Sequence, residues 1–111
     1  MGDGVARGGA VNSMQGGRVR LAMPQKTVEI INEKGMHARA AALFAREASL
    51  HRAAVFIARD GLEVNGKSIM GVLMLAAYCG SEVIIRTEGE GAEKALESLV
   101  ALVENKFGEE A

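Results

Sequence analysis

The segment Gly35-Met36-His37-Ala38-Arg39 combines residues that can handle a phosphoryl group. His37 lies between a glycine-containing loop and the first turn of a helix expected over Ala38–Leu50. The first turn of a helix exposes unpaired N–H groups and the positive end of the helix dipole. That field disfavours the imidazolium cation, and neutral imidazole is the nucleophilic form of histidine. The segment therefore offers a nucleophile beside an anion-binding helix start.

Two neighbours of His37 extend this chemistry. A phosphoryl group on the imidazole would meet the backbone N–H groups of Ala38 and Arg39, because helix N-termini bind anions. The planar guanidinium of Arg39 can brace phosphate oxygens. Such a set suits reversible phosphoryl transfer, in which positioning and charge stabilisation do most of the catalysis. A surface histidine that merely begins a helix fits the same pattern, and spacing alone leaves both interpretations open.

Hydrophobic periodicity predicts the elements that must position this segment. Strands are expected over Lys26–Asn32, Ala54–Arg59, Leu62–Asn65 and Glu82–Thr87, and helices over Ala38–Leu50, Ile69–Tyr78 and Ala92–Phe107. Asp60-Gly61 is a pair that two-residue hairpin turns prefer, and Gly80 is expected to end the second helix. The order β-α-β-β-α-β-α predicts an α+β fold, a two-layer open-faced β-sandwich with helices on one face of a mostly antiparallel sheet.

Composition narrows the class of protein. The 111 residues carry 13 basic and 14 acidic side chains, which argues against a basic nucleic-acid coat. Aromatic residues make up only 4%, so a surface built on base stacking is not expected. The single cysteine, Cys79, and the absence of a secretory signal indicate a reducing, cytoplasmic setting without membrane insertion. The two histidines and Cys79 show no metal-ligand spacing.

The chain divides near residue 23. Residues 1–22 contain six glycines and few large apolar groups, which predicts a disordered N-terminal tail. Met14 or Met23 is a plausible natural start, while three arginines in the tail leave a transit peptide open. One domain is expected over residues 23–108, followed by an acidic, solvated terminus over 109–111 that includes Glu109 and Glu110.

Two segments of the sequence resemble a known family. NEKGMHARAA (32–41) resembles the active-site segment of HPr, the histidine-containing phosphocarrier of the phosphoenolpyruvate-dependent phosphotransferase system, and VNGKSIMGVLML (64–75) resembles the segment around its regulatory serine. The resemblance covers about residues 24–107 and implies the sheet order 1-4-2-3. One departure is Ala40, where the family usually has proline, and this leaves open how rigidly the site is held.

The resemblance implies a role for each matching residue. His37 would accept a phosphoryl group on Nδ1 from enzyme I and pass it to enzyme IIA-type acceptor proteins, with Arg39 and the Ala38 N–H stabilising the phosphate. Ser68 would be the target of an HPr kinase/phosphorylase, although it also suits a helix N-cap. The protein would be a monomeric carrier that needs no cofactor and binds no nucleic acid.

The resemblance also implies a docking surface for partner proteins. An apolar patch is expected from Ala42, Ile69, Met70 and Leu73, with a basic rim from Arg39, Arg46 and Lys67. Core packing is the alternative role for the apolar members. His51 is expected to be a solvated turn residue, and Cys79 a small buried side chain.

Other functions compete with the sugar-transport carrier. A regulatory paralogue, of the nitrogen type, would signal by phosphorylation-dependent protein binding. A generic α+β binding domain would use His37 only structurally. An RNA-binding domain is a third alternative, although no aromatic pair lies on the expected strands.

Overall fold

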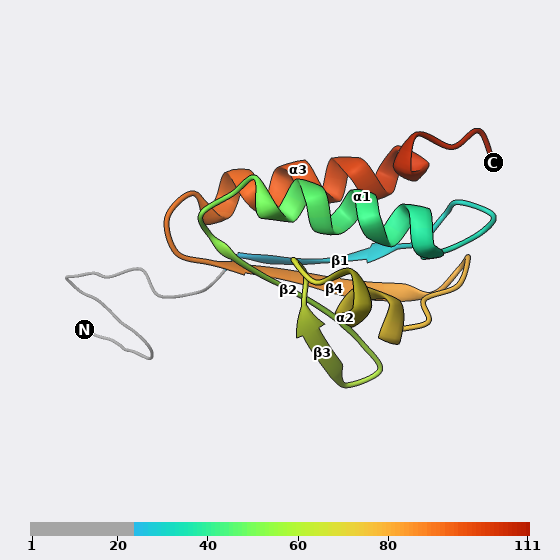
Figure 1. The fold of residues 1–111 in the computed structure, drawn as a ribbon, viewed down its shortest axis with the longest axis horizontal. Helices are drawn as coiled ribbons and strands as arrows, with labels where there is room; N and C mark the ends of the chain where they lie inside the picture. The colour runs from blue at the N-terminus through green and yellow to red at the C-terminus, as the bar shows by residue number, and fades with distance from the viewer. Residues whose placement is uncertain (1–23) are drawn as a thin grey trace, which may run out of the picture.

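The computed structural model describes residues 24–111, which form four strands, three α-helices and one 3₁₀-helix (Figure 1). The expected tail over residues 1–22 lies outside this part of the chain. The elements are β1 (Gln25–Glu29), α1 (Ala38–Ser49), β2 (Ala54–Arg59), β3 (Leu62–Asn65), α2 (Ile69–Met74), β4 (Glu82–Glu88), α3 (Ala92–Glu104) and η1 (Lys106–Gly108).

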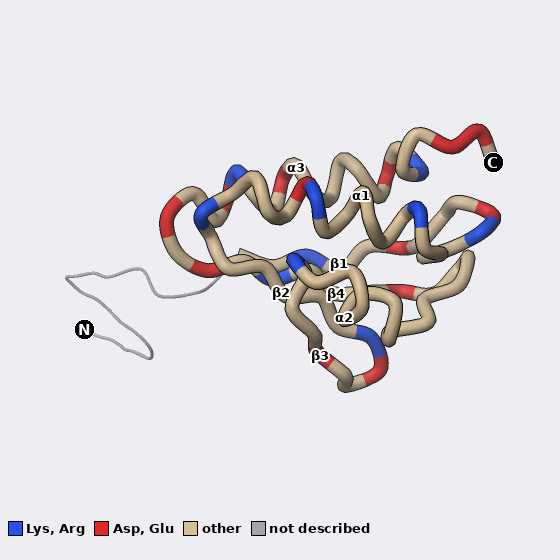
Figure 2. Tube along the Cα trace, viewed as in Figure 1, with Lys and Arg blue, Asp and Glu red and all other residues tan. Residues whose placement is uncertain are grey.

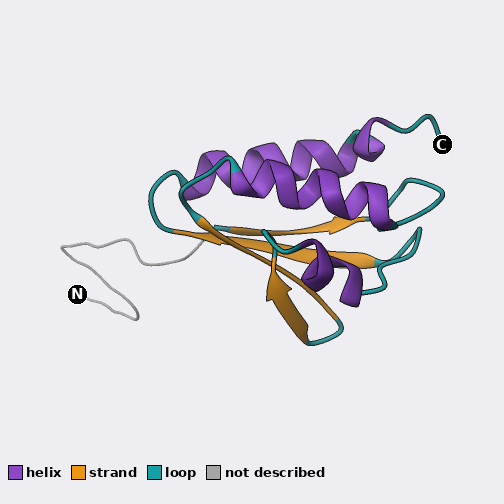
Figure 3. Ribbon diagram, viewed as in Figure 1, coloured by secondary structure: helices purple, strands orange, loops and turns teal. Residues whose placement is uncertain are grey.

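The strands form one antiparallel sheet in the order β1-β4-β2-β3, which confirms the predicted fold class. Helices α1 and α3 lie side by side over the sheet, and α2 packs against α1 and β3 (Figures 1 and 3). Asp60 and Gly61 both have positive φ, 51° and 84°, as the two-residue turn between β2 and β3 requires.

Alternation along the strands turns one face of the sheet towards the helices. Val28, Val55 and Ile85 are buried on that face, while their sequence neighbours point away from it. Helix α1 contributes the buried stripe expected from its sequence, which includes Phe44 and Ala48. This core fixes the rotation of α1 about its own axis, because any rotation would expose the apolar stripe. The direction in which the first turn of α1 faces is therefore fixed as well.

Three predicted element ends were wrong by three or four residues, and the start of β1 and the ends of α1 and β4 were wrong by one residue. Strand β1 ends at Glu29, because the Ile30 carbonyl accepts the N–H of Gly80 and not that of Ser81, the residue opposite Ile30 in the register. Helix α2 ends at Met74, since Ala76 adopts a left-handed φ of 50°. Helix α3 ends at Glu104 for a related reason, because Lys106 and Phe107, the first two residues of η1, both have positive φ.

Candidate functional site

His37 is the N-cap residue of α1. Its extended backbone, φ −80° and ψ −179°, leads into the helix, and its carbonyl accepts the first helical hydrogen bond from Ala41 N–H at 2.8 Å. The N–H groups of Ala38 and Arg39 precede that bond and have no partner within the helix. Ala40 and Ala41 are fully buried in the main core, so their packing holds the start of the helix in place. The arrangement expected from the sequence is therefore present: an imidazole beside a helix N-terminus.

The loop before His37 is held against the loop before β4. Gly35 has a φ of +66°, and a Cβ there would lie 2.8 Å from the carbonyl oxygen of Ala77 and 2.9 Å from Cα of Tyr78. The buried Met36 donates its backbone N–H to Ala77 at 2.8 Å. Glycine is thus required here for both conformation and space, and the contact fixes where His37 emerges.

The imidazole of His37 is engaged on one nitrogen. Its Nε2 lies 2.6 Å from Oε2 of Glu109, and the two side chains are 28% and 13% exposed. The amide of the buried Asn32 donates to the other oxygen of Glu109 at 2.9 Å. The pKa of the Glu109 carboxyl is lowered, first by the hydrogen bond from Asn32 and then by that from His37. Within residues 24–111, no hydrogen bond engages Nδ1.

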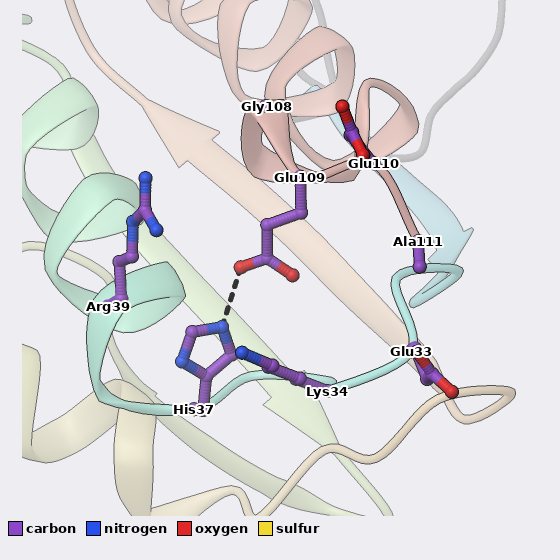
Figure 4. A pocket seen from close by; sticks show the side chains of 8 residues that line it. All are labelled: Glu33, Lys34, His37, Arg39, Gly108, Glu109, Glu110 and Ala111. Atoms are coloured by element: carbon purple, nitrogen blue, oxygen red, sulfur yellow. Dashed lines mark hydrogen bonds and ion pairs between the residues drawn. The ribbon is translucent and has the colours of Figure 1, made fainter.

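An open hollow of about 410 Å³ surrounds the ring. Glu109 and Arg39 both lie above the imidazole in Figure 4, Glu109 to the right and Arg39 to the left, and Lys34 ends beside the ring in the same hollow. Figure 2 shows basic positions at the start of α1 and in the loop before it, close to the acidic end of the chain. Two cations and a helix N-terminus therefore face this space, an arrangement that suits a phosphoryl group.

The prediction of a solvated acidic terminus was wrong for Glu109, although Glu110 is exposed. Sequence reasoning also missed Asn32 as part of the site. No spacing signal could have found this group, since Glu109 lies 72 residues from His37 and 77 from Asn32.

Ser68 is the N-cap of α2, as predicted. Its hydroxyl accepts the N–H of Gly71 at 3.0 Å, and its side chain is half-buried. This bond accounts for a serine at the position without any regulatory role. The hydroxyl nevertheless borders Ile69 and Met70, which are 44% and 70% exposed.

The other residues of the expected docking surface divide into exposed and half-buried groups. Met74 and Tyr78, which follow Met70 at intervals of four residues, are also exposed, although they were not among the residues predicted for this surface. Lys67 donates to the carbonyl of His51 at 2.9 Å, so its charge stays close to the end of α1. Arg46 is exposed, whereas Ala42, Leu73 and Lys67 are half-buried.

Two predictions about single residues were wrong. Cys79 is exposed, because α2 ends at Met74 and the stretch over residues 78–80 lies at the surface. His51 is half-buried and lies 3.3 Å from the carboxylate of Glu47, four residues earlier. Among the described residues, no group of acidic, His or Cys side chains is arranged to hold a metal ion. No helix in that part of the chain is long and apolar enough to cross a bilayer.

The chain is similar to proteins of one family. The family model "PTS HPr component phosphorylation site" matches residues 24–105. The phosphocarrier protein HPr of Treponema pallidum is 46% identical over 88 residues, 79% of this chain and 100% of that protein. The HPr-like protein Crh of Bacillus subtilis is 44% identical over 84 residues, 76% of this chain and 99% of that protein. The crystal structure of HPr-C-His from Thermoanaerobacter tengcongensis matches with a TM-score of 0.78 and 44% identity, covering 80% of this chain and 100% of that one.

Proposed function

The chain belongs to the HPr family of phosphocarrier proteins, and from this premise we propose that His37 is the residue that carries the phosphoryl group. The observation that supports this most directly is the imidazole at the N-cap of α1, whose Nδ1 has no hydrogen-bond partner in the described chain. The helix N-terminus would stabilise the arriving negative charge, and Arg39 would pair with the phosphate oxygens.

The proposed reaction is a relay between two other proteins. The Nδ1 lone pair of His37 attacks the phosphorus of the enzyme I phosphohistidine in line, and the N–P bond of the donor breaks as the new one forms. The N–H groups of Ala38 and Arg39 then hold the phosphate until an enzyme IIA-type acceptor takes it. The protein needs no cofactor for this and is a carrier, not a free-standing enzyme.

Mass spectrometry of the intact protein tests the assignment. The chain would be incubated with enzyme I, Mg²⁺ for that enzyme and phosphoenolpyruvate, beside the variants His37→Ala and His51→Ala. We expect one acid-labile phosphate on the parent and on His51→Ala, and none on His37→Ala. An unmodified parent chain, with enzyme I shown to be active on another carrier, would refute the proposal and favour a purely regulatory or binding role.

We further propose that partners dock on the exposed apolar residues beside Ser68. Ile69 and Met70 would enter the interface, with Ala42 and Leu73 behind them, and Met side chains adapt to several partners. Arg39, Arg46 and Lys67 would form a basic rim for acidic partners. Met70→Glu should slow transfer from enzyme I while a small chemical donor, phosphoramidate, still phosphorylates His37 normally. The control is Ile84→Glu, which adds the same charge at an exposed apolar site on β4, on the face of the sheet that points away from the helices.

The second candidate function is regulatory. The similarity to the HPr-like protein Crh supports this candidate. Phosphorylation of Ser68 by an HPr kinase/phosphorylase would add charge at the start of α2, beside Met70. That charge would repel an acidic partner without unfolding the helix. Ser68→Asp should therefore weaken transfer from enzyme I more than Ser68→Ala does, and equal rates for the two variants would count against this role.

A further inference from the structure

The last residues of the chain are folded back onto the start of α1 by a strained turn. Lys106 and Phe107 have positive φ values of 56° and 55°, a conformation that is costly for residues other than glycine. Phe107 is buried in the main core, which offsets that cost. The turn directs Glu109 towards His37, and a backbone oxygen of Ala111 accepts the N–H of Glu33 at 2.9 Å as a second contact.

A buried amide fixes the Glu109 carboxylate. Asn32 is fully buried, and its Nδ2 donates to the carbonyl of Gly35 at 2.8 Å and to Oε1 of Glu109 at 2.9 Å. Both partners only accept hydrogen bonds, so the amide cannot be reversed. Its own Oδ1 has no hydrogen-bond partner among the described residues, a cost that this orientation imposes. Asn32 therefore presents an N–H to one carboxylate oxygen and leaves the other for His37.

We propose that Glu109 is a positioning residue that holds the proton of His37 on Nε2 and so keeps the Nδ1 lone pair free for the phosphoryl group. An ionised carboxylate only accepts hydrogen bonds, so Nε2 must donate across the 2.6 Å contact. During transfer the Nδ1 lone pair forms the new N–P bond, and the donor nitrogen keeps the electron pair of the old one. The Nε2 proton stays in place. The catalytic part of this inference rests on the proposed function of His37.

The substitution Glu109→Gln tests whether Glu109 sets the tautomer of His37, because Asn32 determines which way the introduced amide will face. The Asn32 N–H still requires an acceptor, so the carbonyl of the introduced amide will turn towards it and its NH₂ group will face Nε2. A donor at Nε2 favours the ring tautomer with its proton on Nδ1, which cannot attack phosphorus. The matched control is Glu110→Gln, which removes the same charge from an exposed neighbour that lines the same hollow.

The tautomer can be measured without any phosphoryl donor, by ¹⁵N NMR of protein labelled at histidine. We expect the parent and Glu110→Gln to show His37 protonated on Nε2 at a pH where the ring is neutral, and Glu109→Gln to show it on Nδ1. The signals of His51 should not change and serve as the internal reference. An unchanged His37 pattern in Glu109→Gln overturns the proposal, even if His37 proves to be the phosphorylated residue.

The transfer rate gives a second measurement. Phosphoryl acceptance from enzyme I should slow at least about tenfold in Glu109→Gln, or about 1.4 kcal/mol in activation free energy, and change little in Glu110→Gln. Equal slowing in both variants would identify general loss of acidic charge as the cause and overturn the positioning role. If the parent accepts no phosphate at all, the proposed function fails, while the NMR result still decides whether Glu109 sets the tautomer.

Discussion

Replacing Gly35 with alanine should destabilise the protein through the same contact that positions His37. The left-handed φ of +66° costs a residue with a Cβ about 1–2 kcal/mol. The new Cβ would also lie 2.8 Å from the Ala77 oxygen and 2.9 Å from Cα of Tyr78, both backbone atoms that cannot rotate away. Such overpacking typically costs about 1–3 kcal/mol. The two effects together give an expected loss of about 2–5 kcal/mol in the free energy of unfolding.

Urea unfolding of Gly35→Ala beside Gly61→Ala separates these two effects. Gly61 has a φ of +84°, and a Cβ there would meet no other heavy atom of the described chain within 4 Å. Gly61→Ala should therefore lose only the conformational part, and Gly35→Ala about 1–3 kcal/mol more. Equal losses would refute the close contact between the two loops. If the contact is present, Gly35→Ala should also slow phosphorylation of His37, and Gly61→Ala should not.

Other contacts make predictions of their own. Ser68→Ala loses the acceptor for Gly71 N–H, so urea unfolding should show a loss of about 1 kcal/mol that Ser68→Asp largely avoids. Folding lowers the pKa of Glu109, chiefly through Asn32, so the folded state binds fewer protons. The free energy of unfolding should thus fall as pH drops through that lowered pKa, below the ordinary value of 4.5, and Glu109→Gln should remove this part of the dependence in parallel unfolding titrations. Native Cys79 should react with iodoacetamide about as fast as in the unfolded chain, whereas strong protection would contradict its exposure.

Local patterns in the sequence predicted the elements that local forces decide. The bounds of β2 and β3 were confirmed, because alternating side chains and the turn at Asp60-Gly61 leave one register that buries the apolar face. The start of α1 after His37 and the cap at Ser68 were confirmed for a similar reason, since both depend on groups within four residues. The family resemblance added the strand order, which periodicity alone does not determine.

Contacts between distant segments could not be predicted in this way. The apolar run beyond Met74 fits a longer helix, but Ala76 leaves the helical conformation, and the following Ala77 carbonyl accepts the N–H of Met36. The exposure of Cys79 follows from that early end. Glu109 was predicted to be a solvated terminal charge. Neither the residues beside it nor its distance along the sequence from His37 indicates that the turn at Lys106 and Phe107 folds it back onto α1.

The structure shows how the start of α1 is held with Ala40, and not proline, after Arg39. Ala40 precedes the first helical hydrogen bond, which Ala41 donates to His37, so a proline there would remove no bond of the helix and would only restrict its backbone. In this chain the full burial of Ala40 and Ala41 holds the backbone of the helix start, while Glu109 holds the ring. The two restraints act on different atoms and come from different segments. Glu109→Gln should therefore reorient the proton on the imidazole while α1 still begins at the same residue.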